Sequence, residues 1–419
     1  MKKFILLLIV SLLITPALAS DWNMFKKDES HSGFTTDAVN PPLTVAWTFD
    51  LNFDSDSSPV IVNDVLYVGS NYGIHALDAK TGRELWRNHT NGFVKSAPTV
   101  ADGVLYVGAD DSRFYAMNIK DGAINWIYKN ATDGYTSSPI VINNLAFEGS
   151  KDGSFYAFDV QSGEPSWQVL TGKVIESSPA MRDGIFVFGS HGGLIFAIDT
   201  VTRKEKWRYD SGISDIISSP LIADGSVFVG SNDGNIYALN TTNGALKWKY
   251  STGNNVQSSP SYKDGTIFVG SRDSNMYAID ANTGNLKWKT QTAGFVDSSP
   301  AISNDVVYFG SKNNLIYGLD ANTGKILFRN STGQNDKDYI TSPAISGNML
   351  YAVTHSGVVY AYSGVAVQAT STATPTATET TVTPTLSPTV TPTATKKTPG
   401  FEFPIMVLLI LVLISKRHD

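Results

Sequence analysis

The sequence has 419 residues and no cysteine, and its formal net charge is −6 with a pI near 5.5. The absence of cysteine excludes disulfides, thiolate metal sites and a cysteine nucleophile. The acidic balance argues against a nucleic-acid partner, because such a partner requires a basic face.

The N-terminus has the pattern of a signal peptide over residues 1–19. Two lysines precede an apolar run over residues 4–14, and an Ala-Leu-Ala cleavage site ends at Ala19. The alternative is an N-terminal membrane anchor, but the run is shorter than the roughly twenty residues that span a bilayer. We therefore expect export with cleavage after Ala19, followed by a lead-in segment over residues 20–44.

Residues 45–365 are organised by one repeat. A Ser-Pro or Ala-Pro pair recurs about every forty residues, together with a tryptophan. The pairs end at Pro59, Pro98, Pro139, Pro179, Pro220, Pro260, Pro300 and Pro343. The tryptophans are Trp47, Trp86, Trp126, Trp167, Trp207, Trp248 and Trp288, and Phe328 takes the next place. A fixed period of this size indicates one supersecondary unit that is copied many times.

Each unit predicts four short strands. In the copy over residues 57–86, apolar runs occupy residues 59–62, 65–69, 74–77 and 84–86, with turn residues between them. Later copies place Asp-Gly in the first turn, which suits a two-residue hairpin because both positions accept a positive φ. We name the strands A to D in chain order and expect an antiparallel meander.

The number of units predicts a closed ring. Seven units are complete, whereas the eighth, over residues 341–362, stops after strand C. Residues 45–49 have the pattern of a strand D with no strands A to C before it. The expected fold class is all-β: an eight-bladed β-propeller over residues 45–365, in which the N-terminal strand completes the last blade and leaves no free edge.

The tryptophans have a packing role in such a ring. Ala76, Gly82 and Trp86 recur together in later copies, and a small residue, a turn glycine and a large ring predict a dock between neighbouring blades. Residues 77–86 and 279–288 resemble the repeat of pyrroloquinoline-quinone (PQQ)-type propellers, and the resemblance extends over residues 21–362. It implies the same propeller fold.

After the repeats the composition changes twice. Residues 366–398 are mostly Thr, Pro, Ala, Ser and Val, which is typical of an extended stalk that can carry O-linked glycans. Residues 399–419 hold Pro-Gly-Phe, an apolar run and a basic end. This order resembles the PGF-type sorting signals of archaeal surface proteins, and the resemblance implies a tail that is cut and joined to a lipid. The alternative is a C-terminal membrane anchor that is kept; both place the propeller at the cell surface, on the outer side of the cytoplasmic membrane.

Four Asn-x-Ser/Thr sequons are candidate glycosylation sites of an exported chain: Asn88, Asn130, Asn240 and Asn330. The alternative is that these sequons arise by chance and carry no glycan, because the sequence is rich in Asn and Thr.

The two faces of the predicted ring differ in sequence. The A–B and C–D turns share one face and repeat the same residues, which turn chemistry explains. The D–A and B–C connections share the other face, at the mouth of the channel, and their residues vary. Two residues before the Ser or Ala of each Pro pair stand Asp56, Lys95, Thr136, Glu176, Ile217, Gln257, Asp297 and Ile340. The B–C connections carry Asn71, Asp110, Lys151, His191, Asn232, Arg272, Lys312 and His355.

This variation predicts a binding site at the channel mouth. The alternative is that residues at exposed loop positions change without any functional constraint. With the blades numbered in chain order, blades 7, 8, 1 and 2 are neighbours in the ring and bring Asp297, Asp56 and Lys95 to one sector of the mouth. The longest connection, over residues 330–340, lies in the same sector. The candidate binding residues are Asp56, Lys95, Glu176, Gln257, Asp297, Asp336 and Tyr339.

The resemblance to PQQ-type propellers implies two functions of different classes. Its quinoprotein dehydrogenases bind PQQ in the channel with Ca²⁺, for which Asp56, Glu176, Gln257 and Asp297 could supply some of the oxygen ligands here. This chain lacks the adjacent cysteines and the roofing insertions of those enzymes. The BamB-like lipoproteins of the family are non-catalytic scaffolds. We therefore expect a membrane-tethered scaffold that binds envelope proteins or glycans, without cofactor, metal or catalytic residue, and keep a PQQ- and Ca²⁺-dependent dehydrogenase as the alternative.

Overall fold

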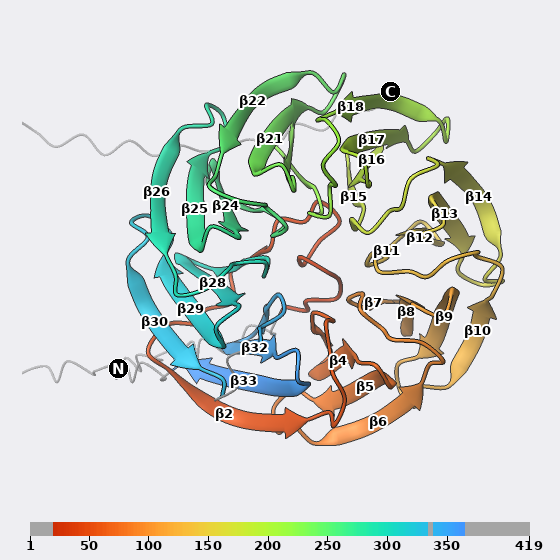
Figure 1. The fold of residues 1–419 in the computed structure, drawn as a ribbon. Helices are drawn as coiled ribbons and strands as arrows, with labels where there is room; N and C mark the ends of the chain where they lie inside the picture. The colour runs from red at the N-terminus through yellow and green to blue at the C-terminus, as the bar shows by residue number, and fades with distance from the viewer. Residues whose placement is uncertain (1–19, 334–337, 365–419) are drawn as a thin grey trace, which may run out of the picture. The chain divides into compact units, whose positions relative to one another are not determined.

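Each predicted unit forms one antiparallel sheet. The computed structural model describes residues 20–333 and 338–364, and this part of the chain forms eight sheets arranged around a central axis (Figure 1). Consecutive strands of a unit are neighbours, with strand A nearest the channel and strand D on the outside of the ring. The prediction of an all-β, eight-bladed propeller is confirmed.

Blades 1 to 4 follow the same order from the channel outward. Blade 1 contains β3 (Val60–Val62), β4 (Val65–Gly69), β5 (Gly73–Asp78) and β6 (Glu84–His89). Blade 2 contains β7 (Thr99–Ala101), β8 (Val104–Ala109), β9 (Arg113–Asn118) and β10 (Ile124–Tyr128). Blade 3 contains β11 (Ile140–Ile142), β12 (Leu145–Gly149), β13 (Ser154–Asp159) and β14 (Pro165–Leu170). Blade 4 contains β15 (Ala180–Arg182), β16 (Ile185–Gly189), β17 (Leu194–Asp199) and β18 (Glu205–Asp210).

Blades 5 to 7 repeat this order. Blade 5 contains β19 (Leu221–Ala223), β20 (Ser226–Gly230), β21 (Asn235–Asn240) and β22 (Leu246–Ser251). Blade 6 contains β23 (Ser261–Lys263), β24 (Thr266–Ser271), β25 (Asn275–Asp280) and β26 (Leu286–Gln291). Blade 7 contains β27 (Ala301–Ser303), β28 (Val306–Ser311), β29 (Leu315–Asp320) and β30 (Ile326–Ser331).

Blade 8 joins the two ends of the propeller sequence. It contains β31 (Ala344–Ser346), β32 (Met349–Val353) and β33 (Val358–Gly364), and its outer strand is β2 (Leu43–Asp50) from the N-terminal side. The register of this antiparallel pair runs from Leu43 opposite Gly364 to Asp50 opposite Val358. The strand that the sequence predicts as an isolated strand D therefore lies on the third strand of the last unit.

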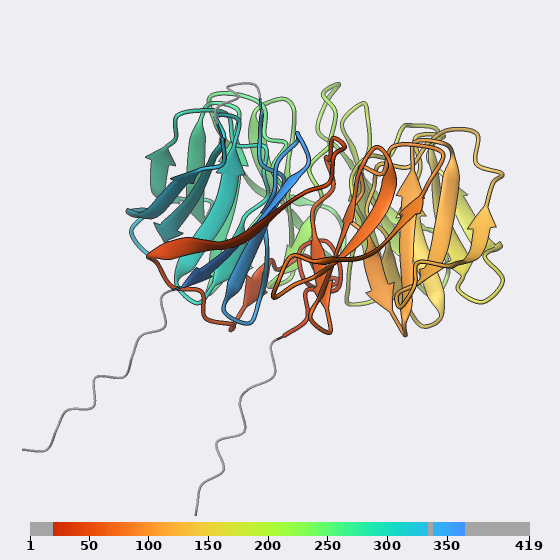
Figure 2. The same cartoon turned by 90° about the horizontal axis from the view of Figure 1, so that it is seen from below.

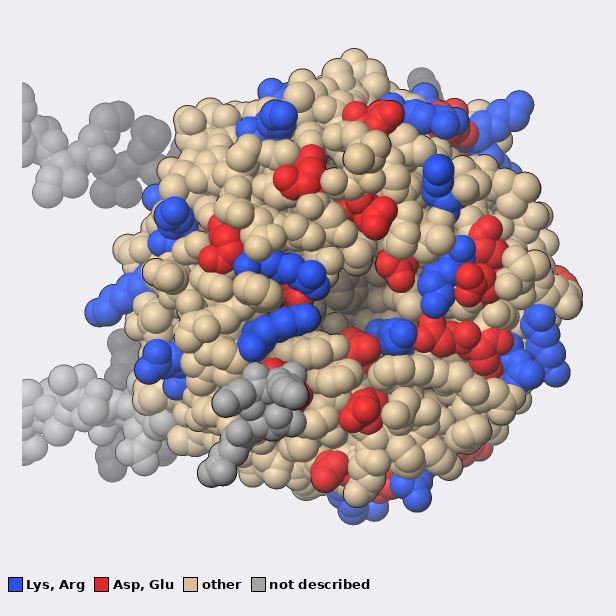
Figure 3. Space-filling model, viewed as in Figure 1, with Lys and Arg blue, Asp and Glu red and all other residues tan. Residues whose placement is uncertain are grey.

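The connections divide the ring into two faces. We call the side with the D–A and B–C connections the mouth face and the side with the A–B and C–D turns the turn face. The A–B hairpins use two residues with positive φ, as at Asp224 (φ 48°) and Gly225 (φ 66°), which is the backbone that Asp-Gly favours. Figures 1 and 3 view the mouth face, and Figure 2 shows the ring from its side with the mouth face at the top.

The lead-in segment lies in the channel (Figure 1), toward the turn face (Figure 2). Trp22 exchanges backbone hydrogen bonds with Ile61 in blade 1, and β1 (Phe34–Thr35) pairs in parallel with β27 of blade 7. Between them, lead-in carbonyls accept amide hydrogens from the inner strands of successive blades: Glu29 from Met181, Ser30 from Ile222, Ser32 from Tyr262 and Gly33 from Ile302. The segment therefore forms an inner seam that connects the blades across the channel.

Neighbouring blades are held together by a repeated tryptophan contact. At six junctions the indole N–H of strand D donates to a carbonyl in the C–D turn of the next blade, at 2.9–3.0 Å. The pairs are Trp47 with Ala79, Trp86 with Ile119, Trp126 with Val160, Trp207 with Thr241, Trp248 with Ala281 and Trp288 with Ala321. In each case the ring lies against the turn glycine, where an added Cβ would come within 2.5–2.7 Å of a ring atom. The glycine is therefore required both for its positive φ and for the space above it.

The serines of the Ser-Ser-Pro motif form a second set of links. The Ser218 hydroxyl donates to the Ser258 carbonyl at 3.0 Å, and the Ser258 hydroxyl donates to the Ser298 carbonyl at the same distance. The next serine accepts an amide hydrogen from the previous blade, as Ser259 Oγ does from Ser219 N at 2.9 Å. The backbone groups that these serines bind lie in the adjacent blade, so the motif links neighbouring blades near the channel.

One blade places a carboxyl group in its core. Glu148 on β12 is fully buried, beside the fully buried Tyr135, at a strand position where blades 1, 2, 5 and 6 carry valine. Gly108 of the neighbouring blade makes room for both side chains. Within the described residues, neither the Glu148 carboxyl oxygens nor the Tyr135 hydroxyl has a hydrogen-bond partner. Burial therefore raises the pKa of Glu148 well above its ordinary value.

The predicted signal peptide, stalk and sorting tail, at residues 1–19, 366–398 and 399–419, lie outside the described residues. Within residues 20–333 and 338–364, no helix has the length and apolar character that crossing a membrane requires.

Replacing Trp288 by Ala should lower the free energy of unfolding by about 3 kcal/mol, because a buried ring and its hydrogen bond are both lost. Trp167→Ala should cost less, since the Trp167 indole makes no such hydrogen bond within the described residues. Urea unfolding followed by circular dichroism measures both losses. Equal losses would contradict a stabilising role for the indole hydrogen bond.

Glu148→Gln should raise the melting temperature at neutral pH but not at acid pH. Below the ordinary glutamate pKa, near 4.5, the carboxyl is protonated in both states and carries no penalty. As the pH rises through that value, only the unfolded state ionises, so the wild type loses stability up to the raised pKa of the folded state. Thermal melts at about pH 4 and about pH 7.5 measure the gap between the proteins. A gap that does not change with pH would show that Glu148 is ionised in the fold.

Candidate functional site

The mouth face carries a hollow at the centre of the ring, surrounded by acidic and basic side chains (Figure 3). The D–A connections bring one residue per blade to the start of the inner strand, and the B–C connections place a second residue farther out. The structure shows that these two sets of residues largely pair with each other.

Lys95 and Lys151 share one acidic partner. Asp110, in the B–C connection of blade 2, lies 2.7 Å from Lys95 Nζ and 3.0 Å from Lys151 Nζ of blade 3. Burial alone would raise the pKa of Asp110, but the hydrogen bonds and charges of the two lysines outweigh it and hold that pKa below its ordinary value. This cluster carries one more positive than negative charge.

The next cluster along the ring is acidic. Glu176 Oε2 lies 2.8 Å from His191 Nε2 in the same blade, and Asp215 Oδ1 lies 4.0 Å from His191 Nδ1. Asp215 also accepts the Gly192 amide hydrogen at 2.9 Å, which fixes its carboxylate at the rim.

Blades 6 and 7 form a longer network. Arg272 donates two hydrogen bonds to the Asp297 carboxylate, at 2.9 and 3.0 Å, and a third to Gln257 Oε1 at 2.5 Å. Lys312 Nζ lies 3.2 Å from the same Asp297 carboxylate. A bidentate guanidinium contact fixes both side chains, and the extra lysine leaves the network with a net positive charge.

Blades 8 and 1 continue this network. Lys312 Nζ lies 4.8 Å from the centre of the Tyr339 ring, and the Tyr339 hydroxyl donates to Asp56. His355 Nδ1 lies 2.7 Å from Asp56 Oδ1, and the His355 ring stacks on Tyr339 with centroids 4.6 Å apart. Burial, together with the hydrogen bond to Asp56, raises the pKa of Tyr339, so its hydroxyl stays protonated and donates.

The predicted site residues therefore fall into three groups. Gln257, Asp297, Tyr339 and Asp56 belong to one continuous network, whereas Lys95 and Glu176 belong to separate clusters. Asp336 lies outside the described residues. Sequence reasoning missed the pairing that builds these groups, although opposite charges in the D–A and B–C sets of the same or neighbouring blades are a signal that could have found it.

The carboxylates do not converge on a calcium site. Within the described residues, no three His, Asp or Glu side chains are grouped so that they could hold a metal ion. Asp56, Glu176 and Asp297 each face a basic or imidazole side chain, so their oxygens are directed to those partners and away from a common ion. The mouth residues thus do not fit the oxygen cage of six to eight ligands that Ca²⁺ prefers.

The sequons differ in exposure. Asn130 is exposed, whereas Asn88, Asn240 and Asn330 are half-buried. The Asn88 amide donates to the Gly122 carbonyl, and Asn240 Oδ1 accepts the Thr242 amide hydrogen at 2.8 Å. Asn130 is therefore the sequon with the most open side chain.

Comparison with known proteins places the chain among two kinds of propeller. The quinohemoprotein alcohol dehydrogenase of Comamonas testosteroni is 25% identical over 214 residues, which cover 46% of this chain and 26% of that protein. The outer membrane protein assembly factor BamB of Escherichia coli is 30% identical over 104 residues, which cover 21% of this chain and 26% of that protein. The matched part thus spans about a quarter of each relative's length.

Solved structures share the fold. BamB from Moraxella catarrhalis superposes with a TM-score of 0.66 at 19% identity, over 77% of this chain and 98% of that structure. The Comamonas dehydrogenase superposes with a TM-score of 0.71 at 15% identity, over 83% of this chain and 81% of that structure. The family model described as outer membrane protein assembly factor BamB matches residues 36–168, 151–261 and 251–392. These matches span most of the sequence, and the chain therefore belongs to the BamB family of PQQ-like repeat propellers.

Proposed function

We propose that this chain is a non-catalytic scaffold that binds proteins or glycans of the cell envelope through its mouth face. One observation carries the proposal: the side chains that vary from blade to blade gather on this face and are held in position by pairing with each other. Paired, half-buried charges form a pattern with fixed positive and negative regions, and such patterns provide selectivity and fast association between proteins.

The arrangement around the mouth is suited to a large partner. The Lys95 cluster and the Arg272–Asp297–Lys312 part of the long network have a net positive charge. The Glu176 cluster between blades 4 and 5 has acidic groups in excess. A partner that covers the hollow would meet all three regions at once. Membership of the BamB family supports a role in envelope assembly, and the predicted signal peptide and tail would place the scaffold outside the cytoplasmic membrane.

A second function is favoured by the quinohemoprotein alcohol dehydrogenase relatives. In a quinoprotein, PQQ supplies a two-electron acceptor for an alcohol. The absence of a fitting oxygen cage among the described mouth residues is the reason that we place this function second.

The amount of partner protein recovered in a pull-down should depend on the side chains of the mouth face. The triple variant Asp56→Ala/Lys95→Ala/Asp297→Ala removes one residue from each of three mouth contacts. We expect a loss of at least about fivefold in partner proteins pulled down from detergent extracts of the source envelope. The control Asp64→Ala/Lys80→Ala/Asp305→Ala removes the same residue types from exposed ion pairs on the turn face and should recover partners like the wild type. Equal recovery by both triple variants, with matched melting curves, would remove the proposed site.

The two functions are separated by adding cofactor to the purified full chain. With PQQ and Ca²⁺ supplied in excess, we expect no quinone absorbance to remain after gel filtration and no alcohol-dependent dye reduction. If quinone absorbance is retained and an alcohol or a sugar supports dye reduction, the proposed scaffold function is wrong and the chain is a dehydrogenase.

A further inference from the structure

The junction between blades 3 and 4 has a tryptophan but lacks the hydrogen-bonded contact that six other junctions share. The C–D turn of blade 4 reads Asp199-Thr200-Val201-Thr202-Arg203, so arginine stands where the corresponding turns of blades 1, 2, 3, 5, 6 and 7 have glycine. Arg203 keeps the positive φ of those glycines, at 59° against 71–74°. A non-glycine residue with this backbone carries a strain of order 1 kcal/mol, which often marks a functional position.

The arginine also removes the space that the tryptophan needs. At the equivalent turn of blade 5, a Cβ added to Gly244 would lie 2.6 Å from a ring atom of Trp207. Because Arg203 has a Cβ, Trp167 cannot lie as close to its turn as Trp207 lies to Gly244. In agreement, the Trp167 indole donates no hydrogen bond to Thr200 within the described residues, whereas Trp207 donates to Thr241 at 2.9 Å.

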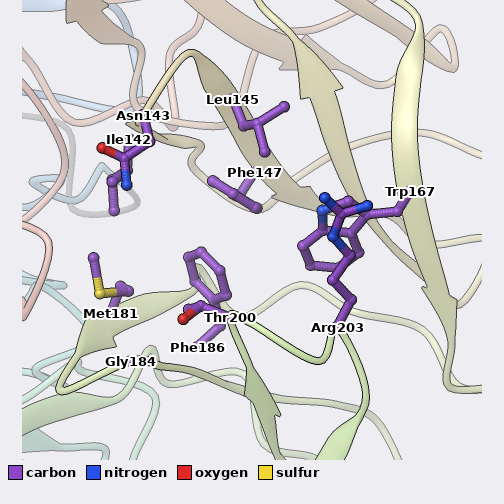
Figure 4. A pocket seen from close by; sticks show the side chains of 10 residues that line it. All are labelled: Ile142, Asn143, Leu145, Phe147, Trp167, Met181, Gly184, Phe186, Thr200 and Arg203. Carbon is purple, nitrogen blue, oxygen red and sulfur yellow. The ribbon is translucent and has the colours of Figure 1, made fainter.

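A pocket of about 330 Å³ opens at this junction (Figure 4). Its walls are apolar and aromatic and come from both blades, with Leu145, Phe147 and Trp167 from blade 3 and Met181 and Phe186 from blade 4. In Figure 4, Arg203 and Trp167 lie at the same end of the pocket. The volume is at the lower limit of small-ligand pockets, about 300 Å³, and fits a single aromatic group.

The residues at the rim of the pocket also differ in type from those at the same positions of the other blades. Val201 is 86% exposed, beside the lining residues Thr200 and Arg203. The matching turn position is polar in other blades, as at Lys80, Gln161 and Asn282. Arg203 is exposed and forms no ion pair within the part of the chain that the structure describes. An exposed apolar side chain and an unpaired guanidinium thus flank an aromatic pocket.

We propose that this pocket binds an aromatic side chain of a partner polypeptide, with an acidic residue beside it that pairs with Arg203. The aromatic walls can make edge-to-face and offset-stacked contacts with an inserted ring. The Arg203 guanidinium can form a charge-assisted hydrogen bond with a carboxylate. Val201 would contact the residue next to the inserted ring, which argues for a polypeptide over a free aromatic acid. This site lies on the turn face and does not depend on the function of the mouth face.

The ligand class can be tested by titrating the full chain with short peptides, observed by saturation-transfer NMR. The probes are acetyl-Ala-Phe-Asp-Ala-amide, the same peptide with Ala for Phe, the same peptide with Asn for Asp, and 3-phenylpropionate. We expect phenyl signals from the first peptide, none from the peptide without Phe, and about fivefold weaker binding without the acid, the size of an exposed ion pair. Absence of binding by the first peptide at millimolar concentration would overturn the proposal.

Two variants of Arg203 separate its roles. Arg203→Gly restores the turn of the repeat, so the Trp167 indole should gain the hydrogen bond to the Thr200 carbonyl and the melting temperature should rise. Binding of the first peptide should weaken, because its carboxylate loses the guanidinium. Arg203→Gln keeps the pocket open and should lose only the preference for the acidic peptide. The control Arg83→Gln removes a charge from the turn face of blade 1 and should bind like the wild type.

Unchanged binding by Arg203→Gly would show that the pocket is not the site. Ile142→Trp, which fills the pocket from the opposite wall, gives an independent check with the same expected loss.

Val201→Ser decides between a polypeptide and a small molecule, because it removes the apolar contact without adding charge. It should weaken binding of the Phe-Asp peptide severalfold and leave binding of 3-phenylpropionate unaffected. If 3-phenylpropionate binds as tightly as the peptide and Val201→Ser changes neither, the pocket takes a small aromatic acid and the polypeptide partner is wrong.

Discussion

The architecture depends on the contact between one tryptophan and one glycine-containing turn of the next blade. The indole ring fills the wedge between two sheets, and its N–H anchors the ring to a carbonyl that the turn leaves free. Because the contact has nearly the same dimensions at six junctions, it repeats the same packing between successive blades. The Ser-Ser-Pro hydroxyls add hydrogen bonds around the channel, so the blades are joined both at the outer strands and near the axis.

The same regularity makes the effect of a single exchange visible at the junction of blades 3 and 4. In an irregular core, an arginine for glycine exchange would be absorbed by many small shifts. Here the neighbouring blades are fixed by their own contacts, so the exchange is confined to one junction, where Trp167 lines a pocket and its indole donates no hydrogen bond within the described residues. On the mouth face, exposed or half-buried loop positions such as Lys95 and Glu176 can differ in charge from one blade to the next, whereas buried loop residues such as Val94 pack with the blades.

The sequence predicts the repeated features well and the unique features poorly. Asp-Gly turns, four apolar runs per unit and the recurring tryptophan identify strands, hairpins and the number of blades, because each signal is present many times. The lead-in around Trp22 has no period, and its hydrogen bonds are made by backbone groups, so its position inside the channel leaves no trace in residue types. The Tyr339–Asp56–His355 cluster joins residues almost three hundred positions apart, and only the closed ring brings them together. Arg203 is visible in the sequence as a departure from the repeat, but its effect on Trp167 requires the dimensions of the contact.

The position of the lead-in has a consequence for the order of events during synthesis. Residues 21–39 leave the ribosome before any blade, yet their backbone partners are spread over inner strands that are made progressively later, up to β27. Strand β2 likewise has no partner until β33 emerges. An early segment whose contacts arrive last delays completion of the fold, since contacts of long sequence separation form slowly. Until the final blade is translated, the nascent chain carries an open strand edge, and a chaperone or an export channel that shields this edge would act on the first strand of the domain rather than the last.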